Sequence, residues 1–189
     1  MNGLDVTPKQ WIKPSHMRLS YCGRIDFADV DRPLFIYPAT YVRIRFTGTS
    51  IGCQVVNHNH YWQNALGYIL DGKEGRLDLL DHQEVQYFVI ADHLEEGIHE
   101  LILFKRMDAC HHLHFLGFEL DRNGECLPVS AEPRRSIEIY GDSVSAGEVS
   151  EAIDYVGQAD PPHNGEYSNS YYSYGWMAAR KLHARLHCI

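Results

Sequence analysis

The residues with the clearest capacity for chemistry are Gly141, Asp142 and Ser143, which directly follow a short predicted strand at 136–140. A serine attacks an ester carbonyl when a sharp turn exposes its hydroxyl and backbone N–H groups hold the oxyanion that forms. Gly141 allows a tight turn, Asp142 can brace it by accepting backbone N–H bonds, and the N–H of Ser143 can serve as one oxyanion donor. These residues predict Ser143 as an acyl-transfer nucleophile. All three types are also frequent in ordinary turns, so a strand-to-loop turn without catalysis is the alternative.

Residues 21–120 show the pattern of successive β-strands. Residues 41–47 alternate, with Val42, Ile44 and Phe46 on one face. Other apolar runs are bounded by turn residues, among them Asp71-Gly72, a pair that suits the positive φ angles of a hairpin turn. Strands that recur at short intervals, with almost no helical periodicity, predict a β-sandwich or jelly roll over residues 1–120.

The pattern changes after residue 120. Residues 121–135 are polar and carry two prolines, which predicts a linker. Beyond it we expect a strand at 136–140, a long loop, a helix at 170–186 and the opening of another strand at Leu186. The helix could be capped by Ser168, Asn169 or Ser170, and its predicted apolar stripe is Tyr171, Tyr174, Ala178 and Leu182. Because strand, loop, helix and strand form the unit of a parallel sheet, 136–189 are predicted to be the N-terminal part of an α/β domain.

Composition excludes some partners. The 189 residues include 17 Lys or Arg and 25 Asp or Glu, a net charge of −8 with histidine neutral. Phosphate binding requires clustered basic side chains, so we expect no nucleic-acid partner. No apolar run approaches the about 20 residues of a membrane helix, so we expect no membrane partner either. The N-terminus lacks the features of a signal peptide, which favours the cytoplasm for the chain as given, and secretion of a native form stays open.

The cysteines and histidines favour neither a disulfide framework nor a metal site. The five cysteines are odd in number and form no C-x-x-C pair. Two pairs of histidines, His58 with His60 and His112 with His114, could reach one metal, but no third ligand follows at a fixed spacing. Imidazoles in loops and on strand surfaces are the favoured interpretation, and we expect no metal and no cofactor. His163, in the long loop, is a weaker candidate for a catalytic base.

Aromatic side chains supply an alternative function. Four of them in the predicted sandwich could stack on sugar rings and make it a carbohydrate-binding module: Tyr61, Trp62, Tyr68 and Tyr87. In the C-terminal part, Tyr171 and Tyr174 are expected to pack the helix, whereas Tyr167 and Tyr172 stay open as sugar contacts, and Trp176 belongs to the same cluster. A sandwich that serves mainly as a subunit interface, with the chain as a homo-oligomer, is a further possibility.

A series of ordered stretches carries a resemblance to a known family. They are Tyr21-Cys-Gly-Arg-Ile, Val42-Arg-Ile-Arg-Phe-Thr-Gly-Thr-Ser, Leu70-Asp-Gly, Gly97-Ile-His-Glu-Leu-Ile-Leu-Phe-Lys-Arg, Phe115-Leu-Gly-Phe-Glu-Leu-Asp, Ile137-Glu-Ile-Tyr-Gly-Asp-Ser-Val-Ser-Ala-Gly, and Asn169-Ser-Tyr with Ala178-Ala-Arg-Lys-Leu. With them, residues 18–189 resemble the family two carbohydrate esterases. This resemblance implies a jelly roll followed by an SGNH (GDSL-like) hydrolase domain, and removal of acetyl groups from acetylated sugars or xylan-like polysaccharide with Ser143 as nucleophile.

The chain departs from the family pattern towards its end. The SGNH pattern also requires a later Gly and Asn for the oxyanion hole and a His as general base, and these blocks are missing. Without a base the serine hydroxyl is a weak nucleophile, so we expect the 189 residues alone to be inactive. A central strand of a parallel sheet has a partner strand on each side, and we expect the strand at 136–140 to have only one. We also expect the apolar stripe of the helix to have no sheet to cover. Residues after about 135 should therefore be weakly ordered in isolation.

Overall fold

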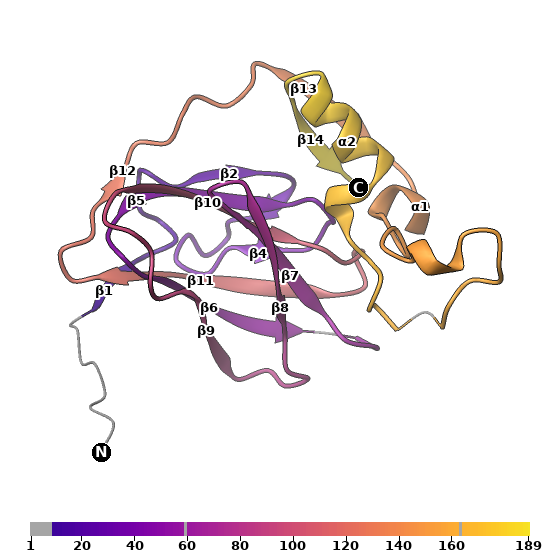
Figure 1. The fold of residues 1–189 in the computed structure, drawn as a ribbon, viewed down its shortest axis with the longest axis horizontal. Helices are drawn as coiled ribbons and strands as arrows, with labels where there is room; N and C mark the ends of the chain where they lie inside the picture. Colours follow the sequence, from indigo (N-terminus) through magenta and orange to yellow (C-terminus); the bar gives the residue numbers. More distant parts are fainter. Residues whose placement is uncertain (1–8, 59, 163) are drawn as a thin grey trace.

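The computed structural model describes residues 9–58, 60–162 and 164–189, and it contains two antiparallel β-sheets packed as a β-sandwich (Figure 1). A separate parallel pair of strands lies at the C-terminal end with a helix beside it. The predicted β-sandwich is confirmed, and the strand predicted at 136–140 lies outside it as β13 (Arg135–Ile139). Among the described residues no helix is long and apolar enough to cross a membrane.

Each sheet of the sandwich has six strands. The first has the order β3-β4-β11-β6-β9, with β1 paired to β11. Its strands are β1 (Lys9–Ile12), β3 (Ile25–Asp26), β4 (Leu34–Phe35), β6 (Ile51–His58), β9 (Val85–Ala91) and β11 (His112–Asp121). The second has the order β12-β5-β10-β7-β8, with β2 paired to β5. Its strands are β2 (Ser20–Cys22), β5 (Tyr41–Thr47), β7 (Ala65–Leu70), β8 (Lys73–Asp78), β10 (Ile98–Lys105) and β12 (Cys126–Leu127).

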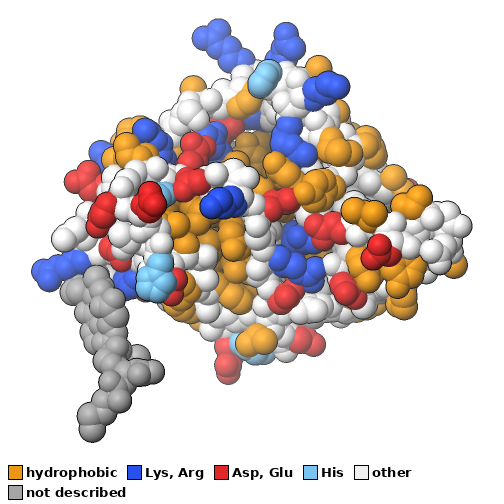
Figure 2. Space-filling view, viewed as in Figure 1, with side chains coloured by type: hydrophobic (Ala, Val, Ile, Leu, Met, Phe, Trp, Pro, Cys, Tyr) orange, Lys and Arg blue, Asp and Glu red, His pale blue; other side chains and the backbone are white. Residues whose placement is uncertain are grey.

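The core of the sandwich follows the alternation in the sequence. Val42, Ile44 and Phe46 of β5 are fully buried between the sheets. The predicted hairpin joins β7 and β8, where Asp71 and Gly72 have φ values of 50° and 79°. Positive φ at both positions is what the turn requires. Figure 2 shows acidic and basic side chains interspersed over one face of the molecule.

The segment predicted as a linker, 121–135, is partly built into the sandwich. Cys126 and Leu127 form β12 and pair with β5. Further along, Glu132 accepts hydrogen bonds from Ser20 and Arg43. The sequence prediction missed these contacts because their partners lie far away in the chain, on strands β2 and β5.

In the C-terminal unit, the main helix is shorter than the predicted 170–186, and the last strand begins before the predicted Leu186. The unit consists of β13, α1 (Ser143–Ala146), two 3-10 turns, η1 (Ile153–Tyr155) and η2 (Ser170–Tyr172), then α2 (Tyr174–Lys181) and β14 (Ala184–Cys188). The helix predicted over 170–186 begins only at Tyr174, because Ser173 caps it by accepting a bond from the N–H of Trp176 at 3.2 Å. Among the predicted caps, Asn169 caps η2 instead. Strand β14 pairs with β13 in parallel.

The predicted apolar stripe of this helix is wrong at three of its four residues, and only Tyr171 packs as predicted. Tyr174, Ala178 and Leu182 are exposed, whereas Trp176 and Ala179 are buried. Trp176 lies parallel to the ring of Tyr41 at 5.9 Å between centroids and meets Phe104 edge-on at 5.0 Å. The helix therefore turns the face with Trp176 and Ala179 to the aromatic side chains of β5 and β10.

Candidate active site

The turn after β13 is held by the neighbouring strand end. Gly141 donates its N–H to the carbonyl of Ile189 at 3.1 Å, and the N–H of Ile189 donates to the carbonyl of Ile139 at 2.8 Å. A Cβ atom at position 141 would lie 2.2 Å from Ser145 Oγ. The turn therefore requires glycine at this position, because any side chain would displace the short helix that follows.

Ser143 is the first residue of α1 and is exposed. Asp142 caps the helix from extended backbone, with its Oδ1 accepting the N–H of Val144 at 3.1 Å. Asp142 thus has the bracing role that the sequence predicted. The helix ends at Gly147, which has a φ of 80° and donates to the carbonyls of Ser143 and Val144. This strand-turn-helix presents the Ser143 side chain outward.

A cavity of about 220 Å³ lies beside Ser143. One wall comes from the nucleophile turn and from the end of β14, and the opposite wall comes from the sandwich. The residues that line the cavity are Pro38, Asp108, Ala109, Cys110, Gly141, Asp142, Ser143, Ser145, Ala146, Cys188 and Ile189. The sandwich therefore contributes directly to the surroundings of the candidate nucleophile.

Lys105 supports the sandwich wall of this cavity. It is fully buried, and its Nζ donates to the carbonyl of Met107 at 2.7 Å and to that of Asp108. Burial lowers the pKa of Lys105 to about 7. The amine thus fixes the backbone of the loop between β10 and β11, from which Asp108 faces the cavity.

Arg106 ties the loop after α1 to the sandwich. Its side chain is buried, donates to the carbonyl of Ser168 at 3.1 Å, and forms an ion pair with Glu151. Glu151 also accepts the Asn169 amide at 2.7 Å, and the Asn169 N–H donates to the carbonyl of Gly147 at 3.0 Å. Burial lowers the pKa of Arg106, and Glu151 opposes that shift. The sequence assigned no role to Arg106, although it ends one of the stretches that resemble the family.

Three of the candidate histidines, His58, His112 and His114, lie on the first sheet, in β6 and β11. The rings of His58 and His112 stack at 5.2 Å, and His114 meets His58 edge-on at the same distance. Burial, together with neighbouring positive charge, lowers the pKa values of His58 and His112. Within 9–58, 60–162 and 164–189 no group of three or more His, Cys, Asp or Glu side chains is arranged to hold a metal. The candidate base His163 lies outside the described residues.

The aromatic candidates divide between core and surface. Tyr171 packs with Trp176 against Phe104, whereas Tyr174 is exposed, which is a correction to its predicted packing role. Tyr61 and Trp62 are exposed in the loop between β6 and β7. The remaining candidates are Tyr172, exposed and bonded to Glu74; Tyr87, exposed and bonded to Glu119; and Tyr68 and Tyr167, both half-buried.

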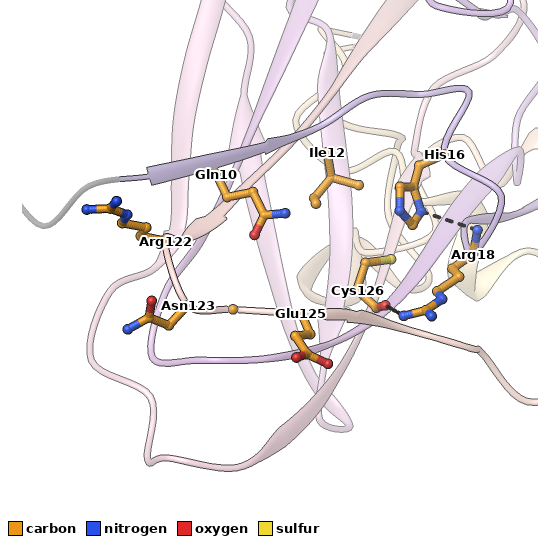
Figure 3. A pocket seen from close by; sticks show the side chains of 9 residues that line it. Gln10, Ile12, His16, Arg18, Arg122, Asn123, Glu125 and Cys126 are labelled. Carbon is orange, nitrogen blue, oxygen red and sulfur yellow. Dashed lines mark hydrogen bonds between the residues drawn. The ribbon is translucent and has the colours of Figure 1, made fainter.

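A second hollow lies at the other end of the sandwich (Figure 3). It has a volume of about 590 Å³ and is open to solvent. Its lining includes Gln10, His16, Arg18, Arg122 and Glu125, from β1, β12 and the loops beside them. None of its lining residues belongs to the nucleophile turn, so the smaller cavity at Ser143 is the candidate active site.

Comparison with known proteins gives the family of the chain. Residues 21–129 match the model for the carbohydrate esterase 2 N-terminal domain, and the chain belongs to this family. The Cellulase/esterase CelE of Acetivibrio thermocellus is 30% identical over 170 residues, which are 89% of this chain and 20% of that protein. The chain thus spans about a fifth of this curated relative.

Solved structures agree with this assignment. A family two carbohydrate esterase from Clostridium thermocellum, in complex with cellohexaose, matches 90% of this chain and 50% of its own, with 27% identity and a TM-score of 0.80. A family two carbohydrate esterase from Cellvibrio japonicus has the same fold over 96% of this chain and 52% of its own, with 21% identity and a TM-score of 0.83. The resemblance to family two is confirmed, and this chain spans about half the length of the solved relatives.

Proposed function

We propose that this chain provides the β-sandwich and the nucleophile turn of a serine esterase that removes acetyl groups from acetylated sugars or xylan-like polysaccharide. The observation that supports it is the position of Ser143, exposed at a strand-to-helix turn and facing a cavity of about 220 Å³. Membership of the carbohydrate esterase 2 family adds the substrate class. An acetyl ester carried on a sugar is small enough for this cavity to receive the acyl group.

In the proposed reaction Ser143 Oγ attacks the carbonyl carbon of the acetyl ester while its proton passes to a general base. The backbone N–H of Ser143 has no acceptor within its own short helix, and it donates to the oxyanion. The bond from the carbonyl carbon to the sugar oxygen then breaks, and the sugar hydroxyl leaves with a proton. Water hydrolyses the acetyl-serine, which releases acetate and restores the serine.

The described residues around the cavity supply no evident general base. None of the described residues that line the cavity is a histidine. The family resemblance implies a histidine from a later part of an SGNH domain, and the 189 residues alone are therefore expected to be inactive.

The test uses this chain joined to the C-terminal half that its solved relatives carry. Ser143→Ala should lower the rate of aryl acetate hydrolysis by at least about 10³-fold, the scale for losing a nucleophile. Ser136→Ala, an exposed serine on β13, is the matched control and should retain activity. Equal hydrolysis by the Ser143→Ala protein would exclude the assignment.

Carbohydrate binding without catalysis is a second candidate function. It is favoured by the exposed Tyr61 and Trp62 beside the cavity and by the cellohexaose bound to the clostridial relative. Binding that persists in the Ser143→Ala protein, with no hydrolysis by the unaltered joined protein, would select this function.

A further inference from the structure

The cavity beside Ser143 is lined mainly by apolar side chains. They come from both parts of the molecule and are Pro38, Ala109, Cys110, Ala146, Cys188 and Ile189. Against such a wall the hydroxyl groups of a sugar ring would lose their water without gaining partners, which is unfavourable. A short alkyl chain needs no such partners and gains from burial. The lining therefore fits the acyl part of an ester better than its sugar part.

The sandwich side of the cavity comes from two loops that meet at Lys105. The first loop joins β4 to β5, and there the carbonyl of Lys105 accepts the N–H of Ala39 at 3.2 Å. The N–H of Lys105 in turn donates to the carbonyl of Thr40 at 2.9 Å. Ala39 has a φ of 61°, in the left-handed region that residues with a side chain rarely adopt. These bonds hold the strained backbone in place, and Pro38 beside it lines the cavity.

The side chain of the same lysine holds the second loop, between β10 and β11. Lys105 is fully buried, and its Nζ donates to the carbonyls of Met107 and Asp108. Asp108 Oδ1 then accepts the N–H of Cys110 at 2.9 Å, which closes a tight turn with Ala109 at its tip. Ala109 is exposed and lines the cavity. Lys105 thus fixes one loop through its backbone and the other through its amine.

We propose that this wall of the sandwich sets the largest acyl group that Ser143 can accept. Ala109 is the specificity-determining side chain, and Lys105 is a positioning residue that acts through the backbone of the two loops. The inference rests on the proposed esterase function, which assigns the cavity beside Ser143 to the acyl group. A longer acyl chain would have to displace a wall that buried hydrogen bonds hold. In an apolar pocket, one methylene group more or less changes the rate by roughly 10- to 200-fold.

The experiment compares kcat/KM for an aryl propionate and an aryl acetate, with this chain joined to the C-terminal half of its solved relatives. Ala109→Val should lower the propionate-to-acetate ratio at least about tenfold, because it narrows the cavity. Ala109→Gly should raise the ratio by a similar factor. Ala28→Val is the matched control and should leave the ratio unchanged, because Ala28 is exposed in the loop between β3 and β4, away from the cavity lining.

Lys105→Met tests the positioning role separately. It keeps the apolar stem and removes the amine, so the second loop loses both bonds and the propionate-to-acetate ratio should rise towards that of Ala109→Gly. A merely structural role would lower the stability and leave this ratio unchanged. Arg43→Met is the matched control, because Arg43 is also buried and would lose its ion pairs with Glu100 and Glu132, which do not line the cavity. It should destabilise the protein without changing the ratio.

Two results would overturn the proposal. If both Ala109 variants keep the ratio of the unaltered protein, the acyl group lies elsewhere. If Lys105→Met folds with lower stability and an unchanged ratio, its role is structural only. In either case Ser143→Ala would still abolish hydrolysis of both esters, so the proposed esterase function stands. Hydrolysis that continues without Ser143 would instead remove both proposals.

Discussion

Replacing Trp176 by alanine should release the C-terminal unit from the sandwich. Trp176 is 6% exposed and connects α2 to Tyr41 of β5 and Phe104 of β10. Removal of a buried tryptophan side chain costs about 3–5 kcal/mol, through lost burial and the cavity left behind. Since about 1.4 kcal/mol is a factor of ten, the local opening of this unit should become roughly 10² to 4 × 10³ times more frequent.

Hydrogen exchange on the 189-residue chain measures this effect directly. Amides of β13 and β14 should exchange faster by that factor in Trp176→Ala, while amides of the central strand β6 keep their rates. Met177→Ala is the matched control, because Met177 is the next residue on the same helix and is 47% exposed. Unchanged exchange in β13 and β14, or equal acceleration in β6, would refute the two-part organisation and the role of Trp176.

The same measurement on the unaltered chain bears on the expectation that residues after about 135 are weakly ordered in isolation. That expectation did not include the contact of Trp176 with the sandwich. With this contact, we expect clear protection of Ile137 and Ile139 in β13, and free exchange there would support the sequence-based expectation instead.

Further predictions concern single side chains. Although burial acts in the opposite direction, hydrogen bonds from Ser50, Thr49 and Lys9 lower the pKa of Asp121 to about 2, so its stabilisation is present above about pH 4 and is lost as the pH falls towards 2. Asp121→Asn should lower the free energy of unfolding by about 1–2 kcal/mol at pH 7 and by almost nothing at pH 2, as urea titrations would measure. A loss independent of pH would contradict this. Arg106→Met should lower the free energy of unfolding by about 2–3 kcal/mol in the same assay, because it leaves the carboxylate of Glu151 without its cation. An unchanged free energy of unfolding would exclude a stabilising role for this ion pair.

Local patterns predicted the sandwich and the position of the nucleophile turn. The alternation of 41–47 and the Asp71-Gly72 turn depend on neighbouring residues only, so they can be recognised in the sequence. The turn at Ser143 is likewise defined by the strand before it and by the glycine that the close approach of Ser145 requires. The assignment of a role to Ser143 came from chemistry and resemblance, and it stays a prediction.

Long-range contacts account for what the sequence missed. The helix faces the sandwich through Trp176 because Tyr41 and Phe104, far away in the chain, offer an aromatic surface. The start of α2 was misplaced because several adjacent residues are good caps, and only packing selects Ser173. The role of Arg106 depends on Glu151, which no local pattern connects to it.

The central claim is that Ser143 carries the acetyl group during turnover. The measurement is rapid acid quenching of the joined protein during hydrolysis of an acetylated xylo-oligosaccharide, followed by peptide mass spectrometry. The account predicts an acetyl group on the peptide that contains Ser143, and none on that peptide in the Ser143→Ala protein. Hydrolysis that proceeds with the acetyl group on another residue, or at an unchanged rate without Ser143, would contradict it.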